Sequence, residues 1–146
     1  MSVDVETDIV IGRPVDVVAA YACDPSNAPE WYANIESVAW QTPPPVTVGS
    51  KMTFVARFLG RRLEYTYEVV ELVPDERLVM RTAQGPFPME TVYTWTATAP
   101  TSTRMTLGNR GEPAGFSKLM APLMAPAMRR ANRNDLAKIK SILERP

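Results

Sequence analysis

Between residues 51 and 109, apolar and polar side chains alternate along consecutive short segments that are separated only by brief breaks. Alternation with a period of two is typical of β-strands that have one buried face and one exposed face. Breaks this short join neighbouring strands that run antiparallel. The strands predicted here are Lys51–Leu59, Leu63–Leu72, Leu78–Ala83, Met89–Ala97 and Thr103–Asn109.

One face of these strands carries aromatic and methionine side chains, whereas the other carries charged residues and threonines. In one strand, Tyr65 and Tyr67 alternate with Glu64, Thr66 and Glu68. A sheet with a single apolar face must bury that face against another layer. The sequence therefore predicts a sheet that is covered on one side.

Segment 116–144 is the only long element that the sequence offers as a cover for the sheet. Three methionines recur there every four residues and share one helical face: Met120, Met124 and Met128. Pro122 and Pro126 fall on the opposite face, so the segment is amphipathic and is not predicted to span a membrane. Because proline removes a helical hydrogen bond, we expect a kink or a loose first turn around residues 116–126.

The N-terminal third predicts one strand, two short helices and a further strand. Residues 3–11 form the strand, and Pro14 suits the first turn of the helix that follows. Asp24 is a predicted N-cap for the second short helix, and Ile35–Trp40 is the next strand. The whole chain, 1–146, is thus predicted to be one α+β domain with about seven antiparallel strands and a long C-terminal helix.

The composition excludes several kinds of chemistry. The chain has no histidine, which rules out histidine-based catalytic triads and histidine-ligated zinc. Cys23 is the single cysteine, so it cannot form an internal disulfide, and we expect a buried, unreactive thiol. The sequence has no glycine-rich phosphate loop and no cluster of metal ligands, so we expect neither a cofactor nor a metal.

The location and partners follow from charge and hydropathy. No apolar run reaches the roughly 18 residues of a membrane span, and the N-terminus lacks the pattern of a signal peptide, so we expect a cytoplasmic protein. Basic residues are not interleaved with aromatic ones, which argues against nucleic acid as a partner.

Residues 1–50 carry seven acids and one base, whereas residues 104–146 carry nine bases and three acids. Either these ends attract each other within the fold, or a basic helix face contacts an anionic membrane surface or a partner. The oligomeric state is left open.

Three stretches of the sequence resemble one protein family: IVIGRPVDVVAAYACDPSNAPEWYANIESV, VGSKMTFVARF and YEVVELVPDERLVMRT. They resemble the START-like polyketide cyclase/dehydrase superfamily (SRPBCC proteins), which has the helix-grip fold. The resemblance implies a curved antiparallel sheet that wraps around the C-terminal helix, with a deep cavity between them. Relatives include polyketide aromatase/cyclases, lipid and sterol carriers and hormone-binding proteins. No catalytic motif is shared across the family, so no catalytic residue is transferred to this chain.

Side chains on the inner face of the sheet and on the long helix are candidate walls of a cavity for a hydrophobic ligand, either lipid-like or aromatic. Apolar walls with a few polar groups are typical of small-molecule sites, and tyrosine hydroxyls supply such groups. The predicted ligand-binding residues are Trp31, Phe54, Phe58, Tyr65, Tyr67, Met80, Tyr93, Trp95, Met105, Met120, Met124 and Met128, with Met52 as a further wall and Tyr32 near the entrance.

Three functions remain open from the sequence. The first is to bind or carry the hydrophobic molecule without chemistry. The second is a cyclase or aromatase, in which the cavity orients a poly-ketone and a tyrosine or an arginine polarises a carbonyl group. Alternation, however, places Arg57, Arg81 and Glu90 on the outer face of the sheet, where we expect them to be solvated. The third is a protein-interaction module with a closed core, in which the methionines are ordinary packing residues.

Overall fold

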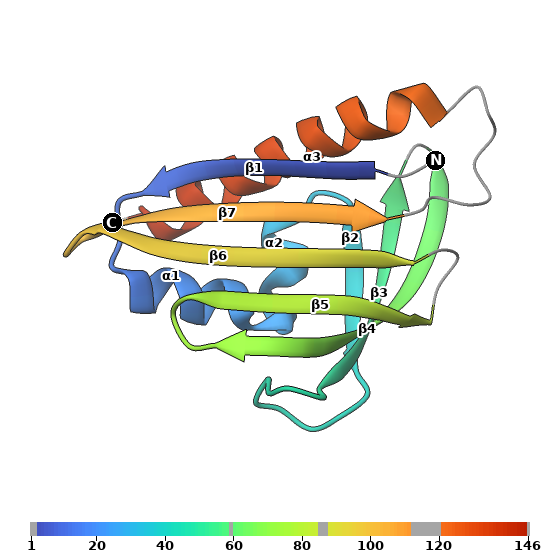
Figure 1. Cartoon of the computed structure of the whole chain (residues 1–146), viewed down its shortest axis with the longest axis horizontal. Helices are drawn as coiled ribbons and strands as arrows, with labels where there is room; N and C mark the ends of the chain where they lie inside the picture. The colour runs from blue at the N-terminus through green and yellow to red at the C-terminus, as the bar shows by residue number, and fades with distance from the viewer. Residues whose placement is uncertain (1–2, 59, 85–87, 112–120, 146) are drawn as a thin grey trace.

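The computed structural model describes residues 3–58, 60–84, 88–111 and 121–145, and seven strands within them form one antiparallel sheet. The strands are β1 (Val3–Ile11), β2 (Ile35–Trp40), β3 (Lys51–Phe58), β4 (Arg61–Val73), β5 (Arg77–Gln84), β6 (Met89–Ala99) and β7 (Ser102–Gly111). Their order across the sheet is β1-β7-β6-β5-β4-β3-β2, so that β1 forms one edge beside β7 (Figure 1). The predicted strands are all present, and the α+β helix-grip fold is confirmed.

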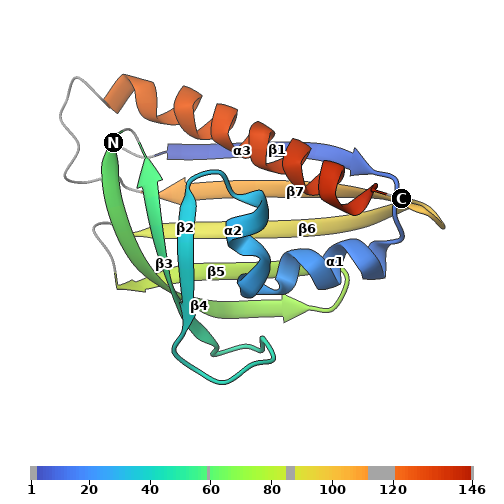
Figure 2. The same ribbon diagram turned by 180° about the vertical axis from the view of Figure 1, so that it is seen from behind.

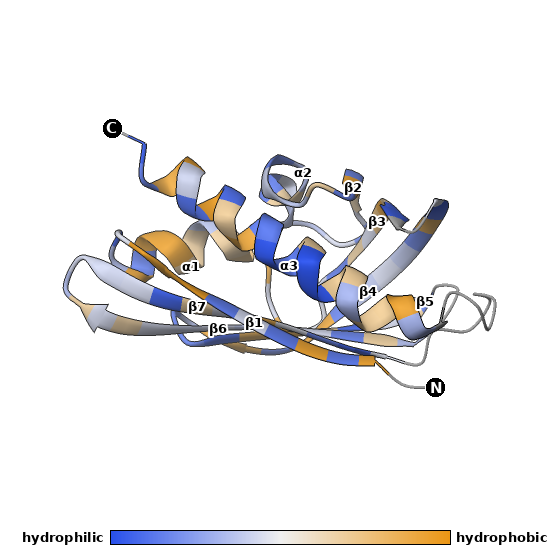
Figure 3. Cartoon of the chain, turned by 90° about the horizontal axis from the view of Figure 1, so that it is seen from above, coloured by the Kyte–Doolittle hydropathy of each residue, from blue (hydrophilic) through white to orange (hydrophobic). Residues whose placement is uncertain are grey.

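The helices lie together on one face of this sheet (Figure 3). They are α1 (Val15–Cys23), the 3-10 turn η1 (Pro25–Asn27), α2 (Ala28–Trp31) and α3 (Ala121–Leu143). The first three carry the chain from β1 at one edge to β2 at the other (Figure 2). Asp24 caps η1, because its Oδ1 accepts a hydrogen bond from the N–H of Ser26 at 3.0 Å. The predicted short helices and their cap are therefore confirmed.

Both prolines of the C-terminal segment are found at or near the start of α3. The described part of the helix begins at Ala121, and Pro122 lies in its first described turn. Pro126 lies inside the helix, which nevertheless continues to Leu143. The predicted kink or loose turn falls partly on residues 116–120, which lie outside the described residues. Within the described part of the chain, no helix is long and apolar enough to cross a membrane.

The sheet curves because β4 changes partners along its length. Its first part pairs with β3, and its second part pairs with β5, with register shifts between Thr66 and Tyr67 and between Val69 and Glu71. Such irregularities bend a strand and increase its twist. Consequently β2 and β3 are steeply inclined to β5, β6 and β7, and the sheet wraps toward the helices (Figure 2).

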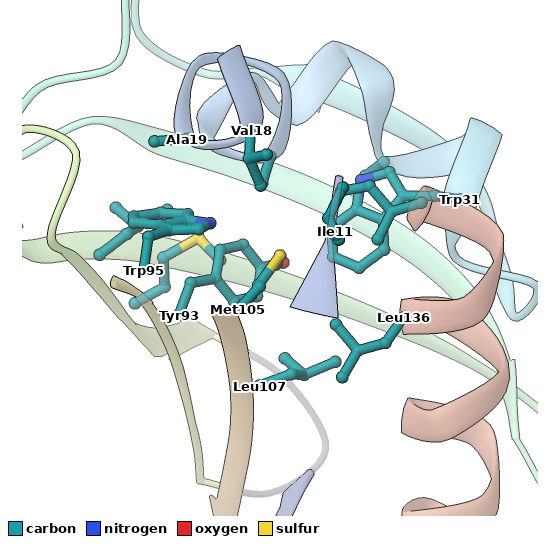
Figure 4. Close-up of a cluster of buried hydrophobic side chains, with 14 of the residues drawn as sticks. Ile11, Val18, Ala19, Trp31, Tyr93, Trp95, Met105, Leu107 and Leu136 are labelled. Atoms are coloured by element: carbon teal, nitrogen blue, oxygen red, sulfur yellow. The ribbon is translucent and has the colours of Figure 1, made fainter. Parts of the chain in front are cut away.

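The buried apolar side chains form two clusters. The large cluster lies beneath α1, α2 and the C-terminal half of α3, and its members include Ile11, Val18, Trp31, Tyr93, Trp95, Met105, Leu107, Leu136 and Ile139 (Figure 4). The small cluster lies at the N-terminal half of α3 and consists of Val3, Val5, Leu63, Tyr65, Met89, Met124 and Met128. The sequence predicted one apolar face of the sheet, and the structure divides the buried side chains between two clusters.

The C-terminal end of α3 is attached to the turn after β1. The carboxylate oxygen Oε2 of Glu144 accepts hydrogen bonds from the N–H of Gly12 and from Nζ of Lys140, each at 2.6 Å. Nη1 of Arg13 donates to the carbonyl oxygen of Leu143 at 2.9 Å. These contacts satisfy groups at the helix end that have no helical partner, and they fix this end of α3 over the sheet.

Candidate functional site

A cavity of about 140 Å³ lies between the curved sheet and α3, where the two clusters meet. Residues from both clusters line it, with Phe54, Met80 and Tyr93 from the large cluster and Leu63 and Met128 from the small one. The core is therefore not completely filled. This observation contradicts the closed core that the interaction-module alternative requires.

Half of the predicted ligand-binding residues line this cavity: Phe54, Tyr65, Tyr67, Met80, Tyr93 and Met128. The strand alternation brings them together, because every second side chain of β3, β4 and β6 points inward. Their rings contact one another edge-on or tilted. The centroid of the Tyr67 ring lies 5.8 Å from that of Phe54 and 5.9 Å from that of Tyr65. The result is a mostly aromatic wall.

Other predicted residues lie elsewhere. Trp31, Trp95, Met105 and Met124 are at most 3% exposed and pack in the two clusters rather than around the cavity. Trp95 and Met105 face each other across β6 and β7 beneath α1 (Figure 4), which fills that part of the inner face. Met52 is also fully buried in the large cluster. Alternation predicts on which face of a strand a side chain lies, but it does not predict which part of the strand borders the cavity. For this reason these residues were predicted to line the cavity although they pack in the clusters. Met120 and the side chain of Phe58 lie outside the described residues.

A relay of polar side chains crosses one wall of the cavity from the sheet to α3. The Thr91 hydroxyl donates to Oδ1 of Asn109 at 2.8 Å and lies 3.5 Å from the hydroxyl of Tyr67. Nδ2 of Asn109 then donates to Oδ1 of Asn132, on α3, at 3.2 Å. Nδ2 of Asn132 is buried and has no hydrogen-bond partner among the described residues. The relay therefore ends in an unused donor.

Two tyrosine hydroxyls form a second polar feature of the cavity wall. Tyr32 follows α2 and Tyr93 lies on β6, and their hydroxyl oxygens are 2.6 Å apart. Burial raises the pKa of both phenols well above the usual value. Both hydroxyls therefore stay protonated at neutral pH, and one of them keeps a hydrogen that is not used within the pair. The sequence placed Tyr32 near the entrance, and the structure places it in the cavity wall.

Asp135 is the acidic group of the cavity. Its side chain projects from α3, the residue is 2% exposed, and Oδ1 accepts a hydrogen bond from the N–H of Ala33 at 3.0 Å. Burial raises the pKa of this carboxyl group to about 6, and the hydrogen bond from Ala33 opposes the shift. A carboxyl group that changes charge near neutral pH inside a cavity is typical of functional sites.

Sequence reasoning missed the polar wall, although the patterns that it used extend to these residues. On β7 the inward positions Met105 and Leu107 are followed two residues later by Asn109. On α3 the buried positions after Met128 are Asn132 and Asp135, at helical spacing. These residues could have been found because each is a polar residue at a position where the strand or helix period predicts burial.

A surface groove lies directly outside the cavity, between α3 and the connection from α2 to β2. Three residues border both spaces: Asn34, Ala131 and Asp135. The exposed side of the groove includes Leu123, which is 53% exposed, and Arg130. The residues shared by both spaces separate the cavity from the groove, so this boundary is one candidate way into the cavity.

The charged residues of the outer sheet face do not reach the cavity. Arg57 is exposed and pairs with Glu36 at 2.5 Å. Glu90, which was expected to be solvated, instead has a side chain that is only 13% exposed, because Arg81 and Arg110 cover it. Nε of Arg81 lies 2.6 Å from its carboxylate. The hydrogen bond from Arg81, followed by that from Arg110, lowers the pKa of Glu90. This cross-strand cluster ties β5, β6 and β7 together on the side away from the cavity.

The described residues form no metal site, and the thiol of Cys23 is not reactive. Among the described residues, no group of acidic or cysteine side chains is arranged to hold a metal ion. Burial raises the pKa of the Cys23 thiol to about 12, with a smaller contribution from Asp75. The thiol is therefore protonated and unreactive at neutral pH. The chemistry available in the cavity comes from Asp135, the tyrosine hydroxyls and the relay.

Comparisons with known proteins identify the family through a family model and the fold through solved structures. The family model of polyketide cyclase / dehydrase and lipid transport proteins matches residues 2–144. The Zhui aromatase/cyclase from Streptomyces sp. R1128 superposes with a TM-score of 0.83 at 14% identity, over 99% of this chain and 95% of that one. A START superfamily protein from Mycobacterium smegmatis gives 0.78 at 12% identity, over 95% and 98% of the two chains. Major latex-like protein 151 from Panax ginseng gives 0.72 at 13%, over 96% of each chain. No protein with a curated function matches the sequence.

Proposed function

The chain belongs to the polyketide cyclase/dehydrase and lipid transport family, and on that basis we propose that it binds a compact, largely aromatic molecule in the cavity beneath α3. One observation carries the proposal: a cavity of about 140 Å³ that has aromatic and methionine walls and a few polar groups. This combination is typical of sites for small molecules.

The volume favours a single aromatic ring over a long acyl chain. An apolar protein cavity of about 150 Å³ is large enough to hold benzene. The rings of Phe54, Tyr65 and Tyr67 offer faces and edges for stacking against such a ligand. A long acyl chain would not fit this volume, so we expect lipids of that kind to bind weakly.

Filling the cavity tests this proposal. Ala131 borders the cavity, and Ala131→Leu should lower the affinity for a one-ring probe such as p-cresol by about tenfold or more, because the added side chain occupies the space. Ala137→Leu is the matched control, because Ala137 is on the exposed face of the same helix. Isothermal titration calorimetry measures both variants, after native mass spectrometry of the purified protein for any co-purifying ligand. Equal affinities in the two variants would place the binding outside the cavity and refute the proposal.

A second candidate function is a cyclase or aromatase reaction, and Asp135 favours it. A carboxylate with a pKa of about 6 is a suitable general base near neutral pH. It would take a proton from a carbon between two carbonyl groups of a poly-ketone. That carbon would attack a further carbonyl carbon, while a hydroxyl of the Tyr32–Tyr93 pair donates to the carbonyl oxygen. The proton held by Asp135 would then pass to the resulting alkoxide. The hydroxyl formed in this way would leave as water together with a hydrogen of the neighbouring carbon, which gives the aromatic ring.

Absorbance spectroscopy with a linear poly-ketone thioester tests this second function. If Asp135 is the base, the native protein should form the aromatic chromophore, and Asp135→Asn should lose the activity while still binding a hydrocarbon probe such as p-xylene. The same slow rate with the native protein, with Asp135→Asn and without protein would leave binding as the function.

A further inference from the structure

Asp135 is a buried carboxylate without a cationic partner. The residue is 2% exposed, and within the described part of the chain no lysine or arginine forms an ion pair with it. Burial raises its pKa and the hydrogen bond from Ala33 lowers it, whereas no nearby cation contributes. Aspartates are almost never fully buried in proteins unless they are paired. The fold therefore leaves one negative charge that a ligand could neutralise.

The carboxylate of Asp135 also has an oxygen that a ligand can reach. Oδ1 accepts the hydrogen bond from Ala33, and no described residue donates to Oδ2. Some side-chain atoms of the described residues are fully enclosed and lack a partner, such as Nδ2 of Asn132, but Oδ2 of Asp135 is not one of them. Oδ2 therefore retains accessible surface. Asp135 borders both the cavity and the groove, so this surface lies where the two spaces meet.

Tyrosine rings lie near Asp135 in the cavity wall. Burial, and to a smaller extent the charge of Asp135, raises the pKa of Tyr32 and of Tyr93, so the carboxylate is within electrostatic range of both hydroxyls. These two residues and Tyr67 line the cavity together with Asp135. A cation over the face of an aromatic ring is attracted to it, and the attraction is stronger when water is excluded. The site thus combines an unpaired carboxylate with the aromatic surface that organic cations prefer.

We propose that Asp135 pairs with a protonated amine, and that the ligand is therefore an arylalkylamine with its ring in the cavity and its ammonium group at the boundary with the groove. This inference rests on the proposed binding function. The ammonium group donates a charge-assisted hydrogen bond to Oδ2. The carboxylate has already lost its water on folding, so binding adds only the cost of dehydrating the amine. A neutral hydroxyl group in the same place donates a hydrogen bond but leaves the charge uncompensated.

The tyrosine pair offers a different kind of recognition. One of the hydroxyls of Tyr32 and Tyr93 keeps a hydrogen that is not used within the pair. This hydrogen favours a neutral ligand that accepts a hydrogen bond, such as an aldehyde or a ketone, and it does not bind an ammonium group. Hydrogen bonds to charged groups are the stronger ones, so we expect Asp135 to decide the preference.

Four one-ring probes of similar size separate these alternatives. Benzylamine is protonated at pH 7.5, and benzyl alcohol has the same shape but is neutral. Benzaldehyde accepts a hydrogen bond and donates none, and toluene does neither. We expect the native protein to bind benzylamine at least about tenfold more tightly than each of the other three. Isothermal titration calorimetry at pH 7.5 measures the four dissociation constants.

Lowering the pH removes the charge of Asp135 but not that of the amine. Its pKa in the free protein is about 6, so at pH 5 only about a tenth of these carboxyl groups are charged, and the affinity for benzylamine should fall about tenfold. Burial raises the pKa of Tyr32, Tyr67 and Tyr93, which therefore stay protonated at both pH values. Arg130, which lines the groove, keeps its charge throughout. The affinity for toluene should not change.

A nearly isosteric variant assigns the preference to Asp135. Asp135→Asn keeps an oxygen for Ala33 but removes the charge, so benzylamine should bind no more tightly than benzyl alcohol, and the affinity for toluene should stay the same. Asp16→Asn removes the same charge from the exposed surface of α1, and it should change none of the four constants. Thermal unfolding shows whether each variant folds. If Asp135→Asn does not fold, the comparison of pH 7.5 with pH 5 on the native protein decides the question.

Each outcome has a separate meaning. Equal affinities of the native protein for all four probes, each reduced by Ala131→Leu, would overturn the amine site and leave the proposed binding function intact. Tightest binding of benzaldehyde would also overturn it, because the tyrosine pair would then select the ligand. A preference for benzylamine that persists in Asp135→Asn or at pH 5 would mean that another group holds the ammonium, which equally overturns it. Binding of none of the probes would overturn the proposed function together with the amine site.

Discussion

The two halves of α3 lie over the same sheet but differ in what they cover. The C-terminal half packs Leu136 and Ile139, both at most 1% exposed, into the large cluster. The preceding part of the helix turns Met128, Asn132 and Asp135 toward the cavity. One continuous helix therefore seals the core at one end and forms a wall of a candidate ligand site at the other.

The difference between the two halves of α3 arises from the short helices, which cover the sheet together with α3. Beside the C-terminal half, α1 contributes Val18 and Ala19, which lie against Trp95 and cover the inner face of the sheet there (Figure 4). Of the first helices, only α2 approaches the cavity, and Tyr32 at its end is part of the cavity wall. The comparison shows that the sheet and the long helix alone leave a void. The short helices decide how much of it is filled.

The largest expected effect is on stability, and it distinguishes a residue that packs the filled core from one that lines the cavity. Leu136→Ala should lower the free energy of unfolding by about 2–5 kcal/mol, because it opens a new cavity in a filled region, and it should leave the affinity for p-cresol unchanged. Met128→Ala should cost less stability, since one side of Met128 already borders a void, and it should change the affinity. Urea unfolding and calorimetry measure the two quantities.

If Met128→Ala proves as destabilising as Leu136→Ala, the void beside Met128 is not present in solution. The distinction between the two halves of the helix would then fail. A change in affinity caused by Leu136→Ala would mean that the two halves are mechanically coupled.

An intermediate effect concerns Asp135 and depends on pH. The folded state raises the pKa of this carboxyl group from 3.8 to about 6, so its contribution to stability is complete below pH 4 and is lost as the pH rises through 6. At pH 7 the buried charge is a cost, and Asp135→Asn should raise the free energy of unfolding by roughly 1–3 kcal/mol. Urea unfolding from pH 4 to 8 measures this gain, which should shrink as the pH falls below 6. A gain that is independent of pH would show that Asp135 does not titrate in this range.

The smallest effect is expected at the attached end of α3. The hydrogen bond from Lys140, followed by that from Gly12, lowers the pKa of Glu144, so this group stabilises the fold above its unfolded pKa and loses that effect as the pH falls through the lowered value. Glu144→Gln keeps an oxygen for Gly12 but loses the charge, so it should slightly lower the thermal midpoint at pH 7. The affinity for p-cresol should not change. If it did, the attachment of this end would control the cavity at the other.

The sequence was sufficient for the fold because the period of the side chains is a local property. Alternation identified the strands and the inward face of Tyr65, Tyr67 and Tyr93, and the short breaks implied their antiparallel order. The division into two clusters depends on where α1 lies across the sheet. That position results from contacts between distant parts of the chain, so the sequence placed Trp95 and Met105 in the cavity when they belong to the filled core.

The site was predicted only in part because polarity was taken as a sign of exposure. Asn109 and Asn132 are polar and yet buried, since each supplies a hydrogen bond within the relay. Glu90 was expected to be solvated, but two arginines from the neighbouring strands cover it. Buried polar groups need partners, and the partners here come from different elements, which no local pattern reveals.

The cluster of Arg81, Glu90 and Arg110 has a consequence for how quickly a ligand exchanges. It joins β5, β6 and β7 on the outer face, in addition to the backbone ladder between these strands. The sheet is thus the stiffer wall of the cavity, and a molecule that exchanges through the boundary at Asn34, Ala131 and Asp135 requires α3 to move away from the connection after α2. The residence time of a bound molecule would then be set by the rate at which α3 separates from the connection after α2, whereas its affinity would be set by the groups on the inner surface.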